Sequence, residues 1–457
     1  MEEETQLTCS FVTKLPTELR IPEAPLAIPA KTSRLGLSQV VNQLLALDRP
    51  RPFDFLLDGE LVRQSLESLV LAHGVSTESV LNIEYILAVA PPKQSPPCQE
   101  NDWVSAVACL KSALRLSGSY DGSIRVWDGD GACLSITPAH KGGVNVIRPL
   151  PTSSSASAPP LLVSAGKDQK ARLWTGPPQD APASHGAHHS ATRLTNGSAS
   201  AQQDTLQAVA VYGGHTDAVQ CAAVNPVGSR LATGGWDSHL FLWPTGAEVA
   251  ASALDGSAAA PVKPSSAARK KRKGEAGSAP AAAIAEPASQ AELQGHLQCV
   301  SGLAWPSDGT LYSCSWDHQV KRWDTETTAC VDTLSGGRAL YCIAAAPEDQ
   351  QVVAFGGADR ALRLWDLRVR HGEKQATQSF VSHQNWIVDI AWSPASPHHL
   401  LTASHDKTLK LWDKRTSIPL HTLQGHTDKV LCCCWLNGQS VLSGGADNLL
   451  QSWVLGQ

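Results

Sequence analysis

One spacing recurs along this chain and constrains its fold more than any other feature: an aspartate followed, after five intervening residues, by a tryptophan. The seven pairs are Asp121 and Trp127, Asp168 and Trp174, Asp237 and Trp243, Asp317 and Trp323, Asp359 and Trp365, Asp406 and Trp412, and Asp447 and Trp453. Six copies carry a hydroxyl residue four positions before the aspartate, namely Ser117, Ser164, Thr233, Ser313, Thr402 and Ser443. In the fifth copy Phe355 takes that place. Such repetition indicates one supersecondary unit that buries its core by stacking on its neighbours.

Histidines extend the repeat in five of the copies. Each follows a small residue and stands 21 to 28 residues before the aspartate, at His140, His215, His296, His383 and His426. The fifth copy lacks both the histidine and the hydroxyl residue, as expected if the two belong to one hydrogen-bond network. Apolar and polar residues alternate between aspartate and tryptophan, for example over 408–412, and short apolar runs precede each aspartate. We therefore predict strand, tight turn and strand in every copy.

A catalytic alternative arises in the fourth copy, where His296, Ser313 and Asp317 lie close together in the sequence. Serine, histidine and aspartate form hydrolase triads in several chain orders. One active site needs one nucleophile in one cleft, whereas these residue types recur in most copies. We therefore interpret them as structural and predict that the chain is not an enzyme.

The repeated units resemble the WD-repeat family, in which a Gly-His pair stands near the start of each unit and a Trp-Asp pair ends it. Trp-Asp is present at 127–128, 323–324, 365–366 and 412–413. The resemblance implies a mainly β fold, a seven-bladed propeller of four-stranded sheets, in which one buried network fastens each blade. Its predicted members are His140, Ser164, Asp168, Trp174, His215, Thr233, Asp237, Trp243, His296, Ser313, Asp317, Trp323, His383, Thr402, Asp406, Trp412, His426, Ser443, Asp447 and Trp453.

Two intervals between successive aspartates, of 69 and 80 residues, are too long for one blade. The surplus lies at about 176–204 and 247–289, where alanine, proline and serine dominate, and we predict disordered insertions there. His185, His188 and His189 in the first insertion lack the fixed geometry that a metal site needs. The second insertion contains five successive cations, which predict nuclear localisation or, alternatively, contact with RNA phosphates. These cations are Arg269, Lys270, Lys271, Arg272 and Lys273.

Composition excludes several classes of site. The 12 cysteines include no C-x-x-C pair, which argues against a zinc or redox motif, and we predict no cofactor. The net charge of −5 does not indicate a nucleic-acid surface over the whole chain. Since the sequence has no run of eighteen apolar residues, we expect a soluble, intracellular protein without a membrane partner.

The repeat begins only at about residue 101, and residues 5–90 are predicted to form a separate domain. Their patterns predict, in order, a strand at 6–13, its partner at 26–28, a helix at 36–46 with Ser38 as N-cap, a hairpin around 58–59, a helix at 65–73 and a strand at 80–86. This is the element order of a small α+β ubiquitin-like fold. Because no Gly-Gly ends the domain, we interpret it as a docking module.

The last blade raises a separate question, because only four residues follow Trp453. They are too few for an outer strand, and an open blade would expose a sheet edge. We predict that residues 92–101 supply the missing strand. Residues 91–100 are then the linker and closing strand, and residues 101–457 form the propeller with its two insertions.

A closer resemblance rests on three segments, at 52–63, 76–85 and 101–105, followed by seven WD repeats with a basic loop between the third and fourth. Together they resemble the nucleolar WD-repeat subunits of the PeBoW complex. The resemblance implies a non-enzymatic scaffold required for large (60S) ribosomal subunit maturation and processing of the 27S/32S pre-rRNA. It also implies the block-of-proliferation WD-repeat protein, pescadillo and pre-60S particles as partners, and a location in the nucleus, nucleolus and nucleoplasm.

In that family and its relative Notchless, the ubiquitin-like domain docks on the AAA ATPase midasin. A glutamate before the last strand completes a Mg²⁺ coordination sphere there, and the matching residue here is Glu78. Mg²⁺ prefers hard oxygen ligands, so a loop carboxylate suits a metal held by the partner, with no metal in the isolated chain. Notchless itself fits less well, because it carries eight repeats.

A second function stays open, in which the chain is a ubiquitin-pathway adaptor whose propeller selects substrates. Such an adaptor needs neither the basic run nor the Glu78 loop. These two features favour the ribosomal interpretation.

Overall fold

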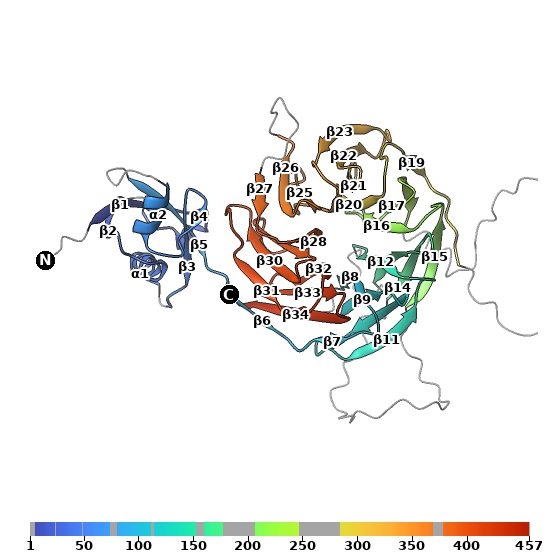
Figure 1. Cartoon of the computed structure of the whole chain (residues 1–457), viewed down its shortest axis with the longest axis horizontal. Helices are drawn as coiled ribbons and strands as arrows, with labels where there is room; N and C mark the ends of the chain where they lie inside the picture. The colour runs from blue at the N-terminus through green and yellow to red at the C-terminus, as the bar shows by residue number, and fades with distance from the viewer. Residues whose placement is uncertain are drawn as a thin grey trace, which may run out of the picture.

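The computed structural model describes residues 5–22, 24–47, 49–73, 80–110, 114–151, 160–176, 206–245, 284–368 and 378–456. A small N-terminal domain lies beside a large ring of sheets (Figure 1). Within these ranges, no helix has the length and apolar character that crossing a bilayer requires.

The N-terminal domain is built on a five-stranded sheet in the order β2-β1-β5-β3-β4. Its elements are β1 (Gln6–Val12), η1 (Thr17–Leu19), β2 (Leu26–Pro29), α1 (Arg34–Leu45), β3 (Phe53–Leu57), β4 (Glu60–Leu61), α2 (Leu66–His73) and β5 (Leu81–Leu87). β1 pairs with β5 in parallel, while its pairing with β2 and that of β3 with β5 are antiparallel. This order gives the ubiquitin-like fold that the sequence predicted.

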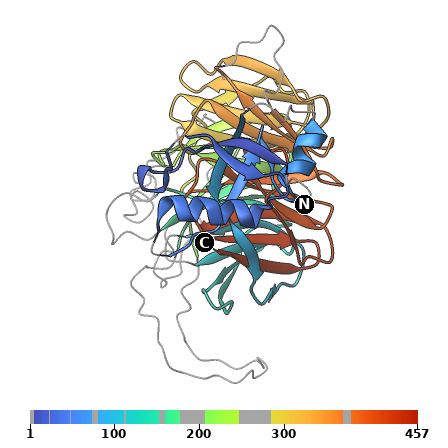
Figure 2. The same ribbon diagram turned by 90° about the vertical axis from the view of Figure 1, so that its left-hand side faces the viewer.

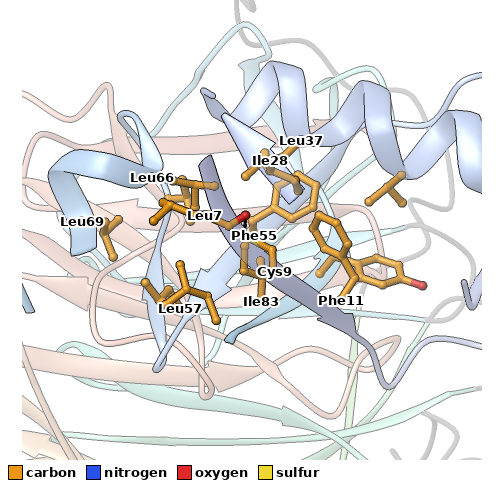
Figure 3. Packing of buried hydrophobic residues seen from close by; sticks show 14 of the residues in the cluster. Leu7, Cys9, Phe11, Ile28, Leu37, Phe55, Leu57, Leu66, Leu69 and Ile83 are labelled. Carbon is orange, nitrogen blue, oxygen red and sulfur yellow. Dashed lines mark hydrogen bonds between the residues drawn. The ribbon is translucent and has the colours of Figure 1, made fainter. Parts of the chain in front are cut away.

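The core of this domain lies between α1 and one face of the sheet (Figure 3). Alternate residues of β1 are buried, as the period of a strand with one covered face requires. Phe11 and Phe53 both pack edge-on against Tyr85, with ring centroids 6.4 and 5.6 Å apart. The Tyr85 hydroxyl donates to the carbonyl of Leu19 at 2.7 Å, so this buried polar group is satisfied.

The predicted N-cap of the first helix is wrong. α1 begins at Arg34, and Ser33 is its N-cap residue. Ser38 lies inside the helix, where its buried hydroxyl accepts a hydrogen bond from the backbone N–H of Phe53 at 3.1 Å. The apolar periodicity starts only at Leu37, one turn after the backbone becomes helical, and this late start explains the error.

Seven antiparallel sheets form the ring, six of four strands and a seventh in which two short strands, β6 and β7, share the outer position. Blade one comprises β8 (Val104–Cys109), β9 (Arg115–Ser119), β10 (Ser123–Trp127) and β11 (Cys133–Pro138), and blade two comprises β12 (Val144–Pro149), β13 (Leu161–Gly166), β14 (Lys170–Thr175) and β15 (Gln207–Gly213). Blade three comprises β16 (Val219–Val224), β17 (Arg230–Gly235), β18 (Leu240–Pro244) and β19 (Ala291–Leu293). Blade four comprises β20 (Val300–Ser307), β21 (Thr310–Ser315), β22 (Gln319–Asp324) and β23 (Cys330–Ser335).

Blades five and six comprise β24 (Leu340–Ala345), β25 (Val352–Gly357), β26 (Ala361–Asp366) and β27 (Gln378–Val381); and β28 (Ile387–Trp392), β29 (His399–Ser404), β30 (Thr408–Asp413) and β31 (His421–Gln424). Blade seven contains β32 (Val430–Asn437), β33 (Ser440–Gly445) and β34 (Leu449–Gly456). The first strands of successive blades contact one another around the axis, and β32 contacts β8 to complete the ring (Figure 1).

Residues before the first repeat complete blade seven. β6 (Ala90–Gln94) and β7 (Cys98–Gln99) pair antiparallel with β34, placing Gln94 opposite Trp453 and Gln99 opposite Leu449. The Gln94 amide also donates to Oε1 of Gln451 at 2.9 Å. Pairing starts at Ala90, two residues before the predicted segment. The interval between β6 and β7 contains Pro96 and Pro97, which have no N–H to donate to a ladder.

The predicted end of the second insertion is too late. Residues 177–204 and 247–283 lie outside the described residues, but 284–289 do not. Ala285 forms a parallel bridge with Ala210 of β15. Its carbonyl accepts from the N–H of Val211 at 2.9 Å, and its own N–H donates to Val209 at 3.1 Å. The alanine-rich composition hides this bridge, because its hydrogen bonds involve only backbone atoms.

The N-terminal domain packs against blade six and the closing part of blade seven (Figures 1 and 2). Leu56 and Ile86 belong to the same apolar cluster as Leu420 and Leu455. Two polar contacts lie beside this cluster. Arg63 donates to the carbonyl of Pro419 at 2.9 Å, and Nε2 of His421 lies 2.8 Å from the carbonyl oxygen of Val89.

Candidate functional site

The blade network of the fourth repeat links two of its strands, β21 and β22, with the turn between them and the loop before β20. Nδ1 of His296 lies 2.7 Å from the Asp317 carboxylate, and Nε2 lies 2.6 Å from the Ser313 hydroxyl. The Trp323 indole donates to that hydroxyl at 2.8 Å. All groups are satisfied when indole N–H donates to serine, serine O–H to Nε2, and Nδ1–H to aspartate.

The same arrangement occurs in blades two, three, six and seven. The histidine Nδ1 lies 2.7 to 3.0 Å from the aspartate, and Nε2 lies 2.6 to 2.8 Å from the hydroxyl. Trp174, Trp243 and Trp412 donate to their hydroxyls at 2.8 to 3.0 Å. In blade seven the buried Trp453 ring has its centroid 6.0 Å from that of His426. The structure therefore brings together the five predicted sets.

Electrostatics keep the aspartates of these sets charged. Burial alone would raise the pKa of Asp317, but hydrogen bonding to His296 and the backbone N–H groups of Leu297 and Gln319 hold it below its ordinary value. The pKa values of Asp168, Asp237, Asp406 and Asp447 are lowered in the same way. Burial lowers the pKa of His140 and of His383, despite the opposing carboxylates, so both rings are neutral at neutral pH.

The serine, histidine and aspartate of blade four thus have the hydrogen-bond order of a hydrolase triad, but not its accessibility. Ser313 has no exposed surface, and its oxygen already accepts from the Trp323 indole. A nucleophile must reach a substrate carbonyl to act. This arrangement fastens strands, and the same explanation serves all five blades.

Known protein families match both parts of the chain. The model of the NLE (NUC135) domain matches residues 7–70. The model of the WD domain, G-beta repeat, matches residues 92–128, 131–175, 206–244, 288–324, 328–366, 374–413 and 417–453. A "Ribosome biogenesis protein WDR12 homolog" from Chlamydomonas reinhardtii is 43% identical, covering 99% of this chain and 98% of that protein.

Two further relatives also align over nearly their whole length. The WDR12 homolog of Arabidopsis thaliana is 36% identical over 98% of this chain and 96% of its own. "Ribosome biogenesis protein YTM1" of Eremothecium gossypii is 32% identical over 99% of this chain and 98% of its own. The chain belongs to the WDR12/YTM1 family.

In this WDR12/YTM1 family member, several residues that the sequence singled out lie outside the described residues. They are Glu78, the basic run Arg269–Lys273, and His185, His188 and His189. Among the residues that the structure does describe, no group of three or more histidine, cysteine, aspartate or glutamate side chains is placed to hold a metal ion. Burial raises the pKa of the Cys314 thiol to about 12, so that sulfur is not a ready ligand.

Blade one contains an equivalent of the histidine network that the sequence did not predict. Glu100 occupies the place of the histidine: it accepts from the Ser117 hydroxyl and from Arg125, and the Trp127 indole donates to Ser117 at 2.8 Å. Burial raises the pKa of Glu100, although Ser117 and Arg125 oppose that effect. A signal was present, because Glu100 stands 21 residues before Asp121, the same spacing as in blade four.

Blade five of this family member uses another substitute. Phe355, buried, replaces the hydroxyl residue, and Arg363 pairs with Asp359. Arg363 also donates to the carbonyl of Gly336 at 3.3 Å, in the loop where other blades place the histidine. One arginine therefore links the turn and the loop that a histidine joins elsewhere in the WDR12/YTM1 chain.

Proposed function

We propose that this chain acts in ribosome biogenesis as a non-enzymatic assembly factor, a scaffold of the PeBoW complex required for 60S maturation and processing of the 27S/32S pre-rRNA. The observation that carries this proposal is the alignment of both domains, over 97 to 99% of the chain, with relatives named for ribosome biogenesis. The buried blade networks support a binding role and not a catalytic one, because their serine, histidine and aspartate side chains are engaged in hydrogen bonds that fasten the strands.

In this proposal the propeller binds the block-of-proliferation protein and pescadillo within pre-60S particles. Arg269–Lys273 direct the chain to the nucleus, and it works in the nucleolus and nucleoplasm. Affinity purification of the tagged full chain from nuclear extract tests this part. Pescadillo and large-subunit precursors are expected in the eluate. Proteasomal or ligase subunits in their place would instead favour a ubiquitin-pathway adaptor.

The N-terminal domain supplies the contact with midasin, through Glu78 and a Mg²⁺ ion held by that ATPase. The loop that contains Glu78 connects α2, which ends at His73, to β5, which begins at Leu81. β5 continues through residues 88 and 89 into β6, the strand that closes blade seven. This continuity supports a release step in which a mechanical force on the N-terminal domain is transmitted through β5 to β6, the strand at which the ring of blades closes.

Glu78→Asp tests the midasin contact, because it keeps the charge and withdraws the carboxylate by one methylene. We expect weaker midasin binding and retention of the factor on pre-60S particles, with assembly of the PeBoW complex unchanged. Glu67→Asp is the matched control, since Glu67 is an exposed acid in α2 of the same domain. Normal release of the Glu78→Asp chain would exclude the contact and leave the scaffold role intact.

A further inference from the structure

One end of the propeller carries a continuous series of aromatic rings that the blade network does not use. Trp236, Trp316, Tyr341, Trp386 and His405 follow one another across blades three to six. Successive ring centroids are 4.9, 6.0, 5.3 and 5.6 Å apart. We refer to these five residues as the aromatic arc.

Local structure explains why the arc lies at one end of the ring. Trp236 and Trp316 immediately precede Asp237 and Asp317 in the turn between the second and third strands of their blades. Trp386 lies in the loop before β28, and its carbonyl accepts from the backbone N–H of His405 at 3.0 Å. The histidine-to-aspartate contact of each network joins the same two loops. Four arc residues therefore lie beside connections that these networks fasten, and the fifth, Tyr341, lies in β24.

Trp236 and Trp386 of the arc are open to solvent, and Trp316, Tyr341 and His405 are half-buried. Trp236 is 47% exposed and Trp386 is 43% exposed, and Leu297, in the blade-four loop of the same end, is 83% exposed. Exposed apolar surface that is contiguous marks interaction sites more often than scattered single residues do. Tryptophan and tyrosine are also the side chains most enriched at the centres of protein interfaces. These properties indicate a docking surface.

Charges beside the arc indicate the partner's chemistry. Four exposed cations stand in the loops of blades five to seven at this end, Arg338, Arg360, Lys407 and Lys429. Hydrogen bonds connect these loops. The backbone N–H of Ala358 donates to the carbonyl of Ala339 at 2.9 Å, and the Lys407 side chain donates through Nζ to the carbonyl of Thr427 at 2.8 Å. The loops at 335–340, 357–361, 382–387, 404–408, 425–430 and 445–449, all described, contain no fully exposed carboxylate.

Their aspartates are engaged within the protein. Asp359 pairs with Arg363, and Asp406 and Asp447 pair with His383 and His426. Half-buried Asp428 accepts from the backbone N–H of Lys429 at 2.8 Å. The four cations are exposed and these four aspartates are at least half-buried, so exposed positive charge predominates in these loops, although the chain as a whole carries a net charge of −5. On the blade-three side of the arc, Asp217 is exposed. Acidic groups of a partner are therefore favoured beside the part of the arc that lies in blades five and six.

We propose that the aromatic arc is the docking surface for a protein segment that carries an aromatic or large aliphatic anchor flanked by aspartate or glutamate. The anchor packs on the exposed faces of Trp236 and Trp386, and the acids meet the cations of blades five to seven. Single-stranded RNA fits less well, because Trp316 meets Trp236 at 68° and Tyr341 at 85°, so successive rings do not form parallel platforms for bases. This inference is independent of Glu78 and of midasin.

The test is selection of phage-displayed random peptides on the intact full chain, followed by fluorescence anisotropy with the enriched peptides as synthetic probes. One variant combines Trp236→Ala with Trp386→Ala, and a second combines Arg338→Glu with Lys407→Glu. Val381→Ala is the apolar control, because Val381 is 73% exposed on an outer strand. Lys31→Glu combined with Lys93→Glu is the charge control, since both lysines are exposed elsewhere.

We expect the enriched peptides to combine an apolar anchor with acids, and to bind each arc variant about tenfold or more weakly than the unaltered chain. The controls should bind normally. The proposal is overturned by an absence of enrichment, by enriched peptides without acids, or by equal binding to the arc variants. It is also overturned if oligouridine RNA binds more tightly than every peptide and depends on the same side chains. Thermal unfolding checks that each variant is folded. If the tryptophan variant unfolds, the charge variant still tests the surface, because it alters only exposed side chains.

Discussion

Glu84 of the N-terminal domain and Arg415 of blade six meet across the domain boundary, with 3.5 Å between Oε1 and Nη1. Arg415 also pairs with Asp413 at 2.5 Å, and the Asp413 side chain has no exposed surface. Burial alone would raise the pKa of Asp413, but Arg415 holds it below the ordinary value. One guanidinium therefore fixes the end of β30 and contacts the neighbouring domain.

Substitution of Glu84 and substitution of Arg415 should lower the free energy of unfolding by different amounts. Glu84→Gln removes the contact between domains and the exposed pair of Glu84 with Lys14. We expect a loss below about 1 kcal/mol in the free energy of unfolding, as for other partly exposed ion pairs. Arg415→Ala leaves the buried Asp413 charge unpaired, which should cost about 3 to 5 kcal/mol. Denaturant unfolding of both variants measures the difference. Equal losses would mean that the Asp413 pair contributes nothing of its own.

Removing one hydroxyl should weaken a whole blade. Thr402→Val keeps the shape of the side chain but leaves the Trp412 indole N–H and Nε2 of His383 without their partner. We expect a loss of about 1 to 3 kcal/mol, the cost of unsatisfied buried polar groups. Thr216→Val, at an exposed loop position, is the control and should change stability by less than about 0.5 kcal/mol. A Thr402→Val chain as stable as the control would show that the network does not stabilise the blade.

The hydrolase alternative makes a contrary prediction for Ser313. A serine activated by His296 and open to substrate would react covalently with a fluorophosphonate probe. Because Ser313 is fully buried and bonded to the Trp323 indole, we expect no labelling of the folded chain. Mass spectrometry of the probe-treated protein measures this directly. Labelling that disappears in Ser313→Ala would restore the catalytic interpretation.

Stability should fall as the solution becomes acidic, in two steps with different causes. Folding lowers the pKa values of His140 and His383. Below the unfolded histidine pKa of about 6.5, the unfolded chain therefore binds protons more readily than the folded chain, and stability falls as the pH decreases further. The aspartate pKa values are also lowered, so their contribution is present above about pH 4 and lost below it. Thermal unfolding from about pH 8 to pH 3 tests both steps. His383→Gln should reduce the first step, and an unchanged profile would contradict this cause.

The sequence predicted those parts of the fold that repeat or that follow a local rule. The network geometry was predictable because each member keeps its spacing from the aspartate, and the N-terminal strands because their apolar residues alternate. Glu100 was missed because a carboxylate, with Arg125 as its counter-ion, replaces an imidazole of different chemistry. The bridge of Ala285 to β15 uses backbone atoms alone and leaves no trace in side-chain type. The aromatic arc depends on loops brought together only when the ring closes.

Ring closure itself can be tested by two truncations that differ only in the closing strands. Removing residues 1–88 retains β6 and β7, which pair with β34, whereas removing residues 1–99 leaves the edge of β34 open and keeps Glu100 of the blade-one network. Both truncations remove the N-terminal domain, so their difference reports on the closing strands and on the contact of Val89 with His421 beside them. We expect the longer truncation to unfold at a lower temperature and to aggregate through the open edge, as seen by light scattering. If both truncations melt together and stay monomeric, the strands before the first repeat do not hold the ring closed.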